Sequence, residues 1–194
     1  MCFVSPRLQK KYPNNSFWHY NLKTLTILYK IFVRPLLEYN TSVWSPHLLR
    51  DIDQIESVQR FFTRSLPGLS TLSYRERLNR LNLQTLEERR IHYDCIYLYK
   101  MLQNLTITPF NSMFTLKCAI NLSSMSTRST NCLALLIPKF HVDAYEHSFA
   151  IRAARYWNVL HNNVVLSHNL HLFSDHLYNF DFSVFMRGRA VKRL

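Results

Sequence analysis

Apolar residues recur at helical spacing along most of the chain. Between positions 22 and 44 they lie three or four residues apart, which predicts a helix with one buried face. Pro35 interrupts this run and removes one backbone hydrogen bond, so we expect a kinked helix or two abutting helices. The apolar positions of this run are Leu25, Leu28, Tyr29, Phe32, Leu36, Tyr39 and Val43.

Three pairs of capping residues predict where the next helices begin. Each pair places Asp, Ser or Thr three residues before Gln or Glu, the spacing of a capping box. The pairs predict helices near 51–66, from about 73 to 81, and near 85–103, and Pro67 and Gly68 end the first of them. The pairs are Asp51 with Gln54, Ser73 with Glu76, and Thr85 with Glu88.

The helix near 85–103 has the strongest pattern in the chain. Ile91, Cys95, Leu98 and Leu102 follow one another at helical spacing, and further apolar residues widen the stripe to a second face. A helix that is apolar on two faces is typical of the centre of a bundle, and Cys95 is then a small core residue.

The second half of the chain contains shorter patterns. Residues 105–131 lose the periodicity and are rich in Asn, Ser and Thr, which indicates a loop or linker. The stretch 133–138 (LALLIP) fits either a short strand or a buried extended segment, and two helices are expected around 149–160 and 170–180. We therefore predict a mainly α protein: a poorly ordered segment (1–21), a helical bundle (22–104), a linker (105–131), a smaller helical C-terminal segment (132–183) and a basic tail (184–194).

Composition narrows the function. The chain has 2 glycines in 194 residues, which argues against glycine-rich phosphate loops and dinucleotide-binding turns and favours long helices. Its net charge of +12 points to a polyanionic partner, most often nucleic acid, although a basic surface kept for solubility is the alternative. The surplus lies at the ends: residues 1–50 hold seven Lys or Arg and one acid, and 105–194 hold nine and four.

Other chemistry has little support in the sequence. No Cys-x2-Cys pair occurs, and the histidines between 161 and 176 have no third ligand at a defined spacing, so we expect no metal and no cofactor. No apolar run fits a secretion signal or a membrane span, and no small-molecule substrate is evident. We expect an intracellular protein with reduced thiols.

Four motifs in a fixed order, between Leu28 and Asn104, carry a family resemblance. They read LYK…VRPLLEY…VWSP, then DIDQIESVQRFFTR, then LSYRERLNRLNLQTLEERR, then LYKML. With STRS, SFAIRAARYWNVL and NLHLFSDHL farther on, this pattern resembles the region after the polymerase palm in reverse transcriptases of jockey-like (LINE-type) non-LTR retrotransposons, over roughly three quarters of the chain.

The resemblance implies a thumb-like bundle without a catalytic centre. The palm of these RNA-directed DNA polymerases carries metal-binding aspartates, whereas no Asp-Asp pair occurs here, so we expect no enzymatic activity. Thumb-like helices imply weak, sequence-nonspecific phosphate contacts with an RNA or DNA duplex. The residues expected to make them are Arg60, Arg64, Arg75, Arg77 and Arg80.

Two alternatives remain open. Instead of a duplex-binding fragment, the chain could be a helical protein-interaction module, or the decayed product of a transposable element without a selected function. For each arginine the alternative is a solvated side chain or an intrahelical ion pair. For Arg89 and Arg90 we expect the intrahelical pair, with Glu87 and Glu88.

Overall fold

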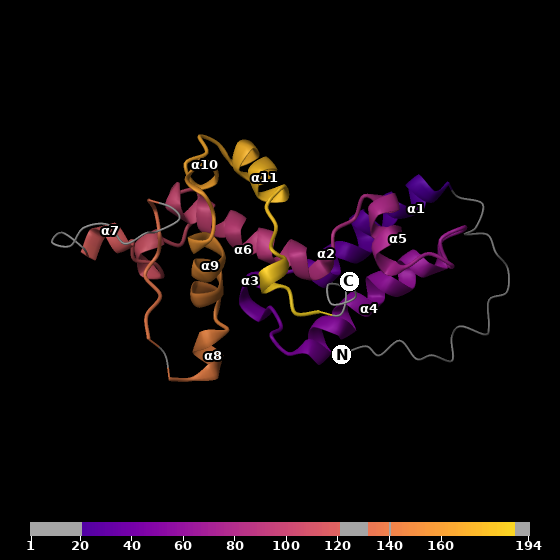
Figure 1. Ribbon diagram of the computed structural model, residues 1–194, viewed down its shortest axis with the longest axis horizontal. Helices are drawn as coiled ribbons and strands as arrows, with labels where there is room; N and C mark the ends of the chain where they lie inside the picture. Colours follow the sequence, from indigo (N-terminus) through magenta and orange to yellow (C-terminus); the bar gives the residue numbers. More distant parts are fainter. Residues whose placement is uncertain (1–20, 121–131, 140, 189–194) are drawn as a thin grey trace. The chain divides into compact units, whose positions relative to one another are not determined.

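The computed structural model describes residues 21–120, 132–139 and 141–188, and these residues are mainly helical (Figure 1). The mainly α class is therefore confirmed. The predicted N-terminal segment lies outside the described residues except for Asn21, whose side chain accepts a hydrogen bond from Lys23 N at the start of α1. None of the described helices is long and apolar enough to cross a membrane.

Helices follow one another closely along the chain. The longer ones are α4 (Leu49–Ser65), α5 (Tyr74–Leu81), α6 (Leu86–Leu102), α9 (Phe149–Asn158) and α11 (Leu170–Tyr178). The shorter ones are α1 (Leu22–Leu28), α2 (Arg34–Glu38), α3 (Thr41–Trp44), α7 (Lys117–Ile120), α8 (Asp143–Glu146) and α10 (Asn162–Val165), with 3-10 turns at Phe110–Ser112 and Ser183–Phe185.

The chain forms two compact units, which we describe separately. The small unit comprises residues 21–37 and 57–83, and the large unit comprises 38–56 and 84–188. This division differs from the predicted one, because α6 belongs with the C-terminal helices and not with α5 in a bundle over 22–104. The predicted boundary near 105 therefore does not separate two packed units.

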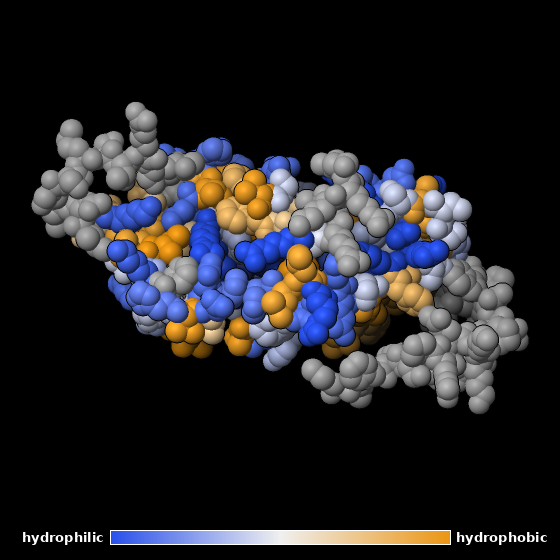
Figure 2. Space-filling model, turned by 60° about the horizontal axis from the view of Figure 1, so that its bottom comes forward, coloured by the Kyte–Doolittle hydropathy of each residue, from blue (hydrophilic) through white to orange (hydrophobic). Residues whose placement is uncertain are grey.

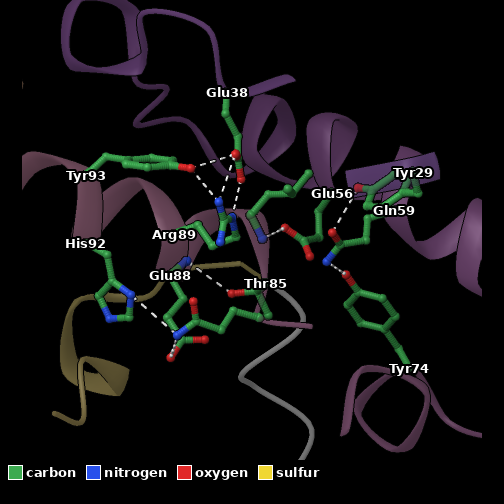
Figure 3. A network of polar contacts seen from close by, with 12 residues as sticks. Tyr29, Glu38, Glu56, Gln59, Tyr74, Thr85, Glu88, Arg89, His92 and Tyr93 are labelled. Carbon is green, nitrogen blue, oxygen red and sulfur yellow. Dashed lines mark hydrogen bonds and ion pairs between the residues drawn. The ribbon is translucent and has the colours of Figure 1, made fainter. Parts of the chain in front are cut away.

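The small unit is built on a core of leucines. Tyr29 from the first helical segment joins it: the Tyr29 ring stacks on Phe62 with the ring centroids 4.3 Å apart. Its hydroxyl donates a hydrogen bond to Gln59 Oε1 at 2.9 Å, and Gln59 Nε2 donates to the Tyr74 hydroxyl at 3.1 Å (Figure 3). This chain of bonds ties α4 and α5 to the helix that precedes them. The buried core residues are Leu25, Leu66, Leu69, Leu78, Leu81 and Leu83.

The apolar face predicted over 22–44 is buried only at its beginning. Leu25 and Tyr29 are buried, whereas Phe32 is 66% and Leu36 78% exposed. A π-helical turn at Tyr29–Val33 joins α1 to α2 directly before Pro35, so the wide turn accommodates the missing proline N–H. The extra residue of such a turn rotates the following positions by about 100° from uniform α-helical spacing, which separates them from the buried face. Apolar residues of this segment accordingly reach the surface. Figure 2 colours apolar residues orange and shows several of them on the face of the molecule that it draws.

The large unit has an aromatic core around α6. Leu98 and Trp157 are fully buried in it, and the ring of Tyr99 stacks on Phe173 of α11 with centroids 4.3 Å apart. The hydroxyl of Tyr99 donates to Ser167 O at 2.7 Å, so its polar end is also satisfied inside the core. In Figure 1, α9 lies beside α6, in agreement with their packing.

Residues 105–116 are mostly irregular and largely exposed, but Phe110 and Phe114 among them are buried against the other aromatic rings of this core. The stretch is therefore a loop anchored to the large unit and not a solvated linker throughout. Of the two alternatives for 133–138, the structure has the buried extended segment and not a strand. Leu135 is buried and extended, makes an isolated antiparallel bridge with Leu116, and exchanges two hydrogen bonds with the side-chain amide of Asn158 at 2.7 and 2.9 Å.

The predicted basic tail begins as part of the fold. Arg187 N and Gly188 N donate to the carboxylate of Glu87 at 2.7 and 2.9 Å, in the first turn of α6. A Cβ on Gly188 would lie 2.8 Å from Glu87 Oε2, so a larger residue there would have to displace this carboxylate. Residues 189–194 lie outside the described part of the chain.

Candidate nucleic-acid interface

The five predicted arginines all belong to the small unit. Arg60 and Arg64 lie on α4, where Arg60 is half-buried and Arg64 is exposed. Arg75, Arg77 and Arg80 lie on the shorter α5, and only Arg75 and Arg80 are exposed. The local sequence fixes α5 firmly, because Ser73 and Glu76 form the predicted capping box, with hydrogen bonds of 3.3 and 2.8 Å. Hydrogen bonding to the Glu76 carboxyl from the side chain of Ser73, and then from its backbone N–H, lowers the pKa of Glu76.

Tyr74 brings two of the arginines together. The guanidinium carbon of Arg60 lies 5.4 Å from the centroid of the Tyr74 ring, and that of Arg77 lies 5.6 Å from it. Both distances fit cation–π contacts. The tyrosine hydroxyl is held by Gln59, so the ring has a fixed position between α4 and α5. Neither Tyr74 nor Gln59 was a predicted site residue, although Tyr74 and Arg77 have the i, i+3 spacing of neighbours on one helical face.

Arg77 is a structural residue and not a phosphate ligand. It is 7% exposed, its Nε donates to Thr63 Oγ1 at 3.2 Å, and Nη1 donates to Leu72 O at 2.9 Å. Burial, followed by the nearby charge of Arg64, lowers the pKa of this guanidinium. We therefore correct the prediction at this position: the side chain is used to connect α5 to α4 and to the loop between them.

The remaining arginines form a loose group. Arg75 and Arg80 are five positions apart, which places them about 140° apart around α5 rather than on one face. In the part of the chain that the structure describes, Arg64, Arg75 and Arg80 form no ion pair. Three unpaired, exposed guanidinium groups on two adjacent helices offer phosphate contacts that need no rearrangement of the fold.

Arg89 and Arg90, in the large unit, do not make the expected intrahelical pairs. Arg89 Nη2 donates to Glu38 Oε2 at 3.1 Å and its Nε also binds that carboxylate, while the hydroxyl of Tyr93 donates to Glu38 at 3.0 Å (Figure 3). Arg90 is buried, and its Nη1 and Nη2 atoms have no hydrogen-bond partner among the described residues. Glu87, its expected partner, accepts the backbone N–H groups of Arg187 and Gly188.

A third arginine of the large unit forms a buried ion pair. Arg152 Nε donates to Asp94 Oδ2 at 2.7 Å, with side-chain exposures of 11% and 2%. Arg152 also donates to the carbonyl oxygens of Ser42 and His147 at 2.6 and 2.9 Å. These bonds connect α3, α6 and the start of α9, so this charge also serves the fold.

The cysteine and histidines considered as thiol or metal-binding residues make other contacts in the structure. Cys95 is fully buried, and burial raises the pKa of its thiol well above the usual value, as expected for a core residue. His171 pairs with Asp175 at 2.9 Å, and His176 lies 3.2 Å from the hydroxyl of Ser167. Among the described residues no group of three His, Cys, Asp or Glu side chains is arranged to hold a metal ion.

Comparison of the chain with protein-family models, curated proteins and solved structures gives no match. The geometry above therefore carries the functional argument together with the sequence motifs.

Proposed function

We propose that this chain is a non-catalytic C-terminal fragment of a non-LTR retrotransposon reverse transcriptase, whose small unit binds RNA–DNA hybrid or DNA duplex weakly and without reading its sequence. The linked motifs between Leu28 and Asn104 support the family. The observation that carries the binding function is the group of unpaired, exposed arginines Arg64, Arg75 and Arg80 on α4 and α5.

Phosphate contact is the chemistry that such a group favours. An exposed guanidinium offers several N–H donors to phosphate oxygens, and its charge displaces counterions from the duplex. The three side chains do not share one helical face, so they fit separate contacts along a backbone. Binding of this kind positions a duplex without specifying sequence.

Polymerase activity is not part of the proposal. Two-metal chemistry needs carboxylates gathered at one point. The carboxylates described above serve other purposes: Glu76 caps α5, Glu38 and Asp94 pair with arginines, and Glu87 holds the backbone of 187–188. We expect no nucleotide incorporation on a primed template with Mg²⁺ or Mn²⁺.

The experiment is a salt titration of duplex binding. For wild type, log K should fall linearly with log salt, with a slope of about −0.9 per phosphate contact on B-DNA. Replacing Arg64, Arg75 and Arg80 by Gln should reduce that slope by two to three units if all three contact phosphate, as about one unit is lost per contact. Since exposed charges contribute little to stability, the melting temperature should stay nearly unchanged.

Two controls separate this interface from general charge. A variant with Lys23, Arg50 and Lys139 changed to Gln removes the same charge from other exposed positions and should change the slope much less. Deleting 189–194 removes Arg189, Lys192 and Arg193 without disturbing the backbone bonds to Glu87. If this deletion abolishes binding while the triple Gln change has no effect, the proposed interface is wrong.

A second candidate function is a helical protein-interaction module. It is favoured by an apolar groove of about 480 Å³ in the small unit, lined by Leu28, Phe32, Val33 and Phe62 among others, with exposed Ile31 and Leu36 on the same helical segment. Exposed apolar surface of this kind is typical of protein contacts. Absence of any salt-dependent duplex binding would favour this candidate over the first.

A further inference from the structure

We propose that the large unit contains a separate binding site for a phosphate-class oxyanion, in a cavity of about 140 Å³ where Arg90 is the central ligand. The cavity is lined by residues of α6, α8 and α9, by the segment after α3, and by the turn at Ser183–Phe185. Its polar lining includes Arg90, Arg155, Arg187, His47, His147 and Tyr156. This site is independent of the proposed function, which rests on the small unit.

Arg90 is the observation that points to a ligand. The residue is 3% exposed, and both Nη atoms are buried without a hydrogen-bond partner in the described part of the chain. Buried donors are almost always paired in folded proteins, because each unpaired charged donor costs free energy. Arg90 also lines the cavity, and an unsatisfied guanidinium fork matches the oxygens of a tetrahedral oxyanion, which it can bind through two parallel bonds once the side chain turns toward the ligand.

Two other arginines around the cavity are already paired. Arg152 is neutralised by Asp94, and Arg155 Nη2 donates to Glu146 at 2.9 Å. Burial lowers the pKa of Arg90, and the nearby charges of Glu56 and Glu87 oppose this only in part. Glu87 accepts two backbone N–H groups and Glu56 accepts Leu86 N at 2.9 Å. Arg90 is thus partly balanced in charge while its Nη donors stay unsatisfied.

The composition of the lining favours an anion over a cation. Four arginines face three carboxylates there, and two histidines add further donors. The rings of His47 and His147 are stacked with centroids 4.0 Å apart, so their ring N–H groups lie close together at the cavity. The phosphate can be free in solution or the terminal phosphate of a nucleic-acid strand, since both present the same oxygens.

The test measures binding of inorganic phosphate to the full chain by calorimetry, with chloride at equal ionic strength as the reference. Wild type should bind phosphate saturably. Arg187→Gln should weaken binding about tenfold or more, because it removes one charged donor. Its side chain is exposed, so the fold should persist. Arg90→Met should abolish binding. Lys139→Gln, at an exposed position of the large unit that does not line the cavity, should leave it unchanged.

The source of the phosphate is distinguished by competition. A short oligonucleotide with a 5′-phosphate, but not its 5′-hydroxyl form, should displace inorganic phosphate if the site takes strand ends. If neither oligonucleotide displaces inorganic phosphate, the site binds free phosphate. The proposal is overturned if wild type shows no effect of phosphate beyond that of chloride, or if Arg187→Gln and any folded Arg90→Met bind as wild type does. In that case the cavity holds only water.

Discussion

The two units use arginine in opposite ways. In the small unit Arg64, Arg75 and Arg80 remain exposed and unpaired within the described chain, and only Arg77 is buried. In the large unit Arg89 and Arg152 are paired with the carboxylates of Glu38 and Asp94, in places that water reaches poorly. The same residue type therefore supplies surface charge in one unit and connects backbone segments in the other, and net charge alone does not separate these roles.

The cores of the two units also differ in the residues that they bury. The small unit buries leucines and leaves Phe32 and Leu36 exposed, whereas the large unit stacks aromatic rings around α6. We expect the large unit to be the more stable of the two, since it buries the larger apolar surface. The following predictions compare the units, from the largest expected effect to the smallest.

The largest effect should come from Leu98→Asp. Leu98 is fully buried in the large unit, so an unpaired carboxylate there should cost several kcal/mol and unfold that unit. Lys100→Asp, on the same helix but only half-buried, is the control and should be much milder. Thermal unfolding followed by circular dichroism measures both, and equal shifts would contradict the position of Leu98 in the core.

A smaller effect is expected on the pH dependence of stability, through His92. Burial, together with the charge of Arg89, lowers the pKa of His92 from 6.5 to about 4. A histidine whose pKa is lower in the folded state adds stability above pH 6.5, and this stability is lost as pH falls toward 4. The loss is about 3 kcal/mol at most, at 1.36 kcal/mol per pKa unit. Asp94 acts in the opposite direction, because burial outweighs Arg152 and raises its pKa, so its contribution is lost as pH rises.

His92→Phe isolates the histidine contribution. The advantage of this variant over wild type in unfolding free energy should grow as pH is lowered from 7 to 4, while the Asp94 contribution cancels between the two proteins. Urea unfolding at each pH measures the difference. The matched change His171→Phe, at a side chain that is 88% exposed, should show no such growth, and equal behaviour of the two variants would contradict the burial of His92.

A still smaller effect is expected for Arg77→Gln in the small unit. The change removes hydrogen bonds from a charged donor to Thr63 and Leu72, which contributes about 2 kcal/mol to stability. Arg75→Gln, on the exposed side of the same helix, should change the melting temperature by almost nothing. If both variants melt alike, Arg77 is a surface residue and belongs with the phosphate contacts after all.

Local signals in the sequence predicted much of the helical structure. The capping residues at Ser73 and Thr85 are confirmed, because caps depend on neighbours within a few positions. The predicted cap at Asp51 is wrong, because α4 begins at Leu49 and Asp51 lies in its first turn. Periodicity also identified the stripe of α6 correctly, since Ile91, Cys95 and Leu98 are buried.

The predictions that were wrong concern contacts between residues that are distant in sequence. Periodicity indicates that the helix over 22–44 has an apolar face, but it does not say whether another element covers that face. Arg77 is buried through Thr63, 14 positions away, and Arg152 meets Asp94 across 58 positions. Capping and spacing patterns carry no information about such long-range partners. For this reason the sequence placed Arg77 in the candidate interface and α6 in the wrong unit.

The most direct test of the central claim is a map of amide hydrogen exchange with and without an RNA–DNA hybrid at low salt. If the small unit binds the duplex, protection should appear in α5 and in the part of α4 from Ser57 to Ser65, and it should disappear in the Arg64, Arg75 and Arg80 to Gln variant. Protection confined to the large unit, or to the end of the chain, would contradict the account.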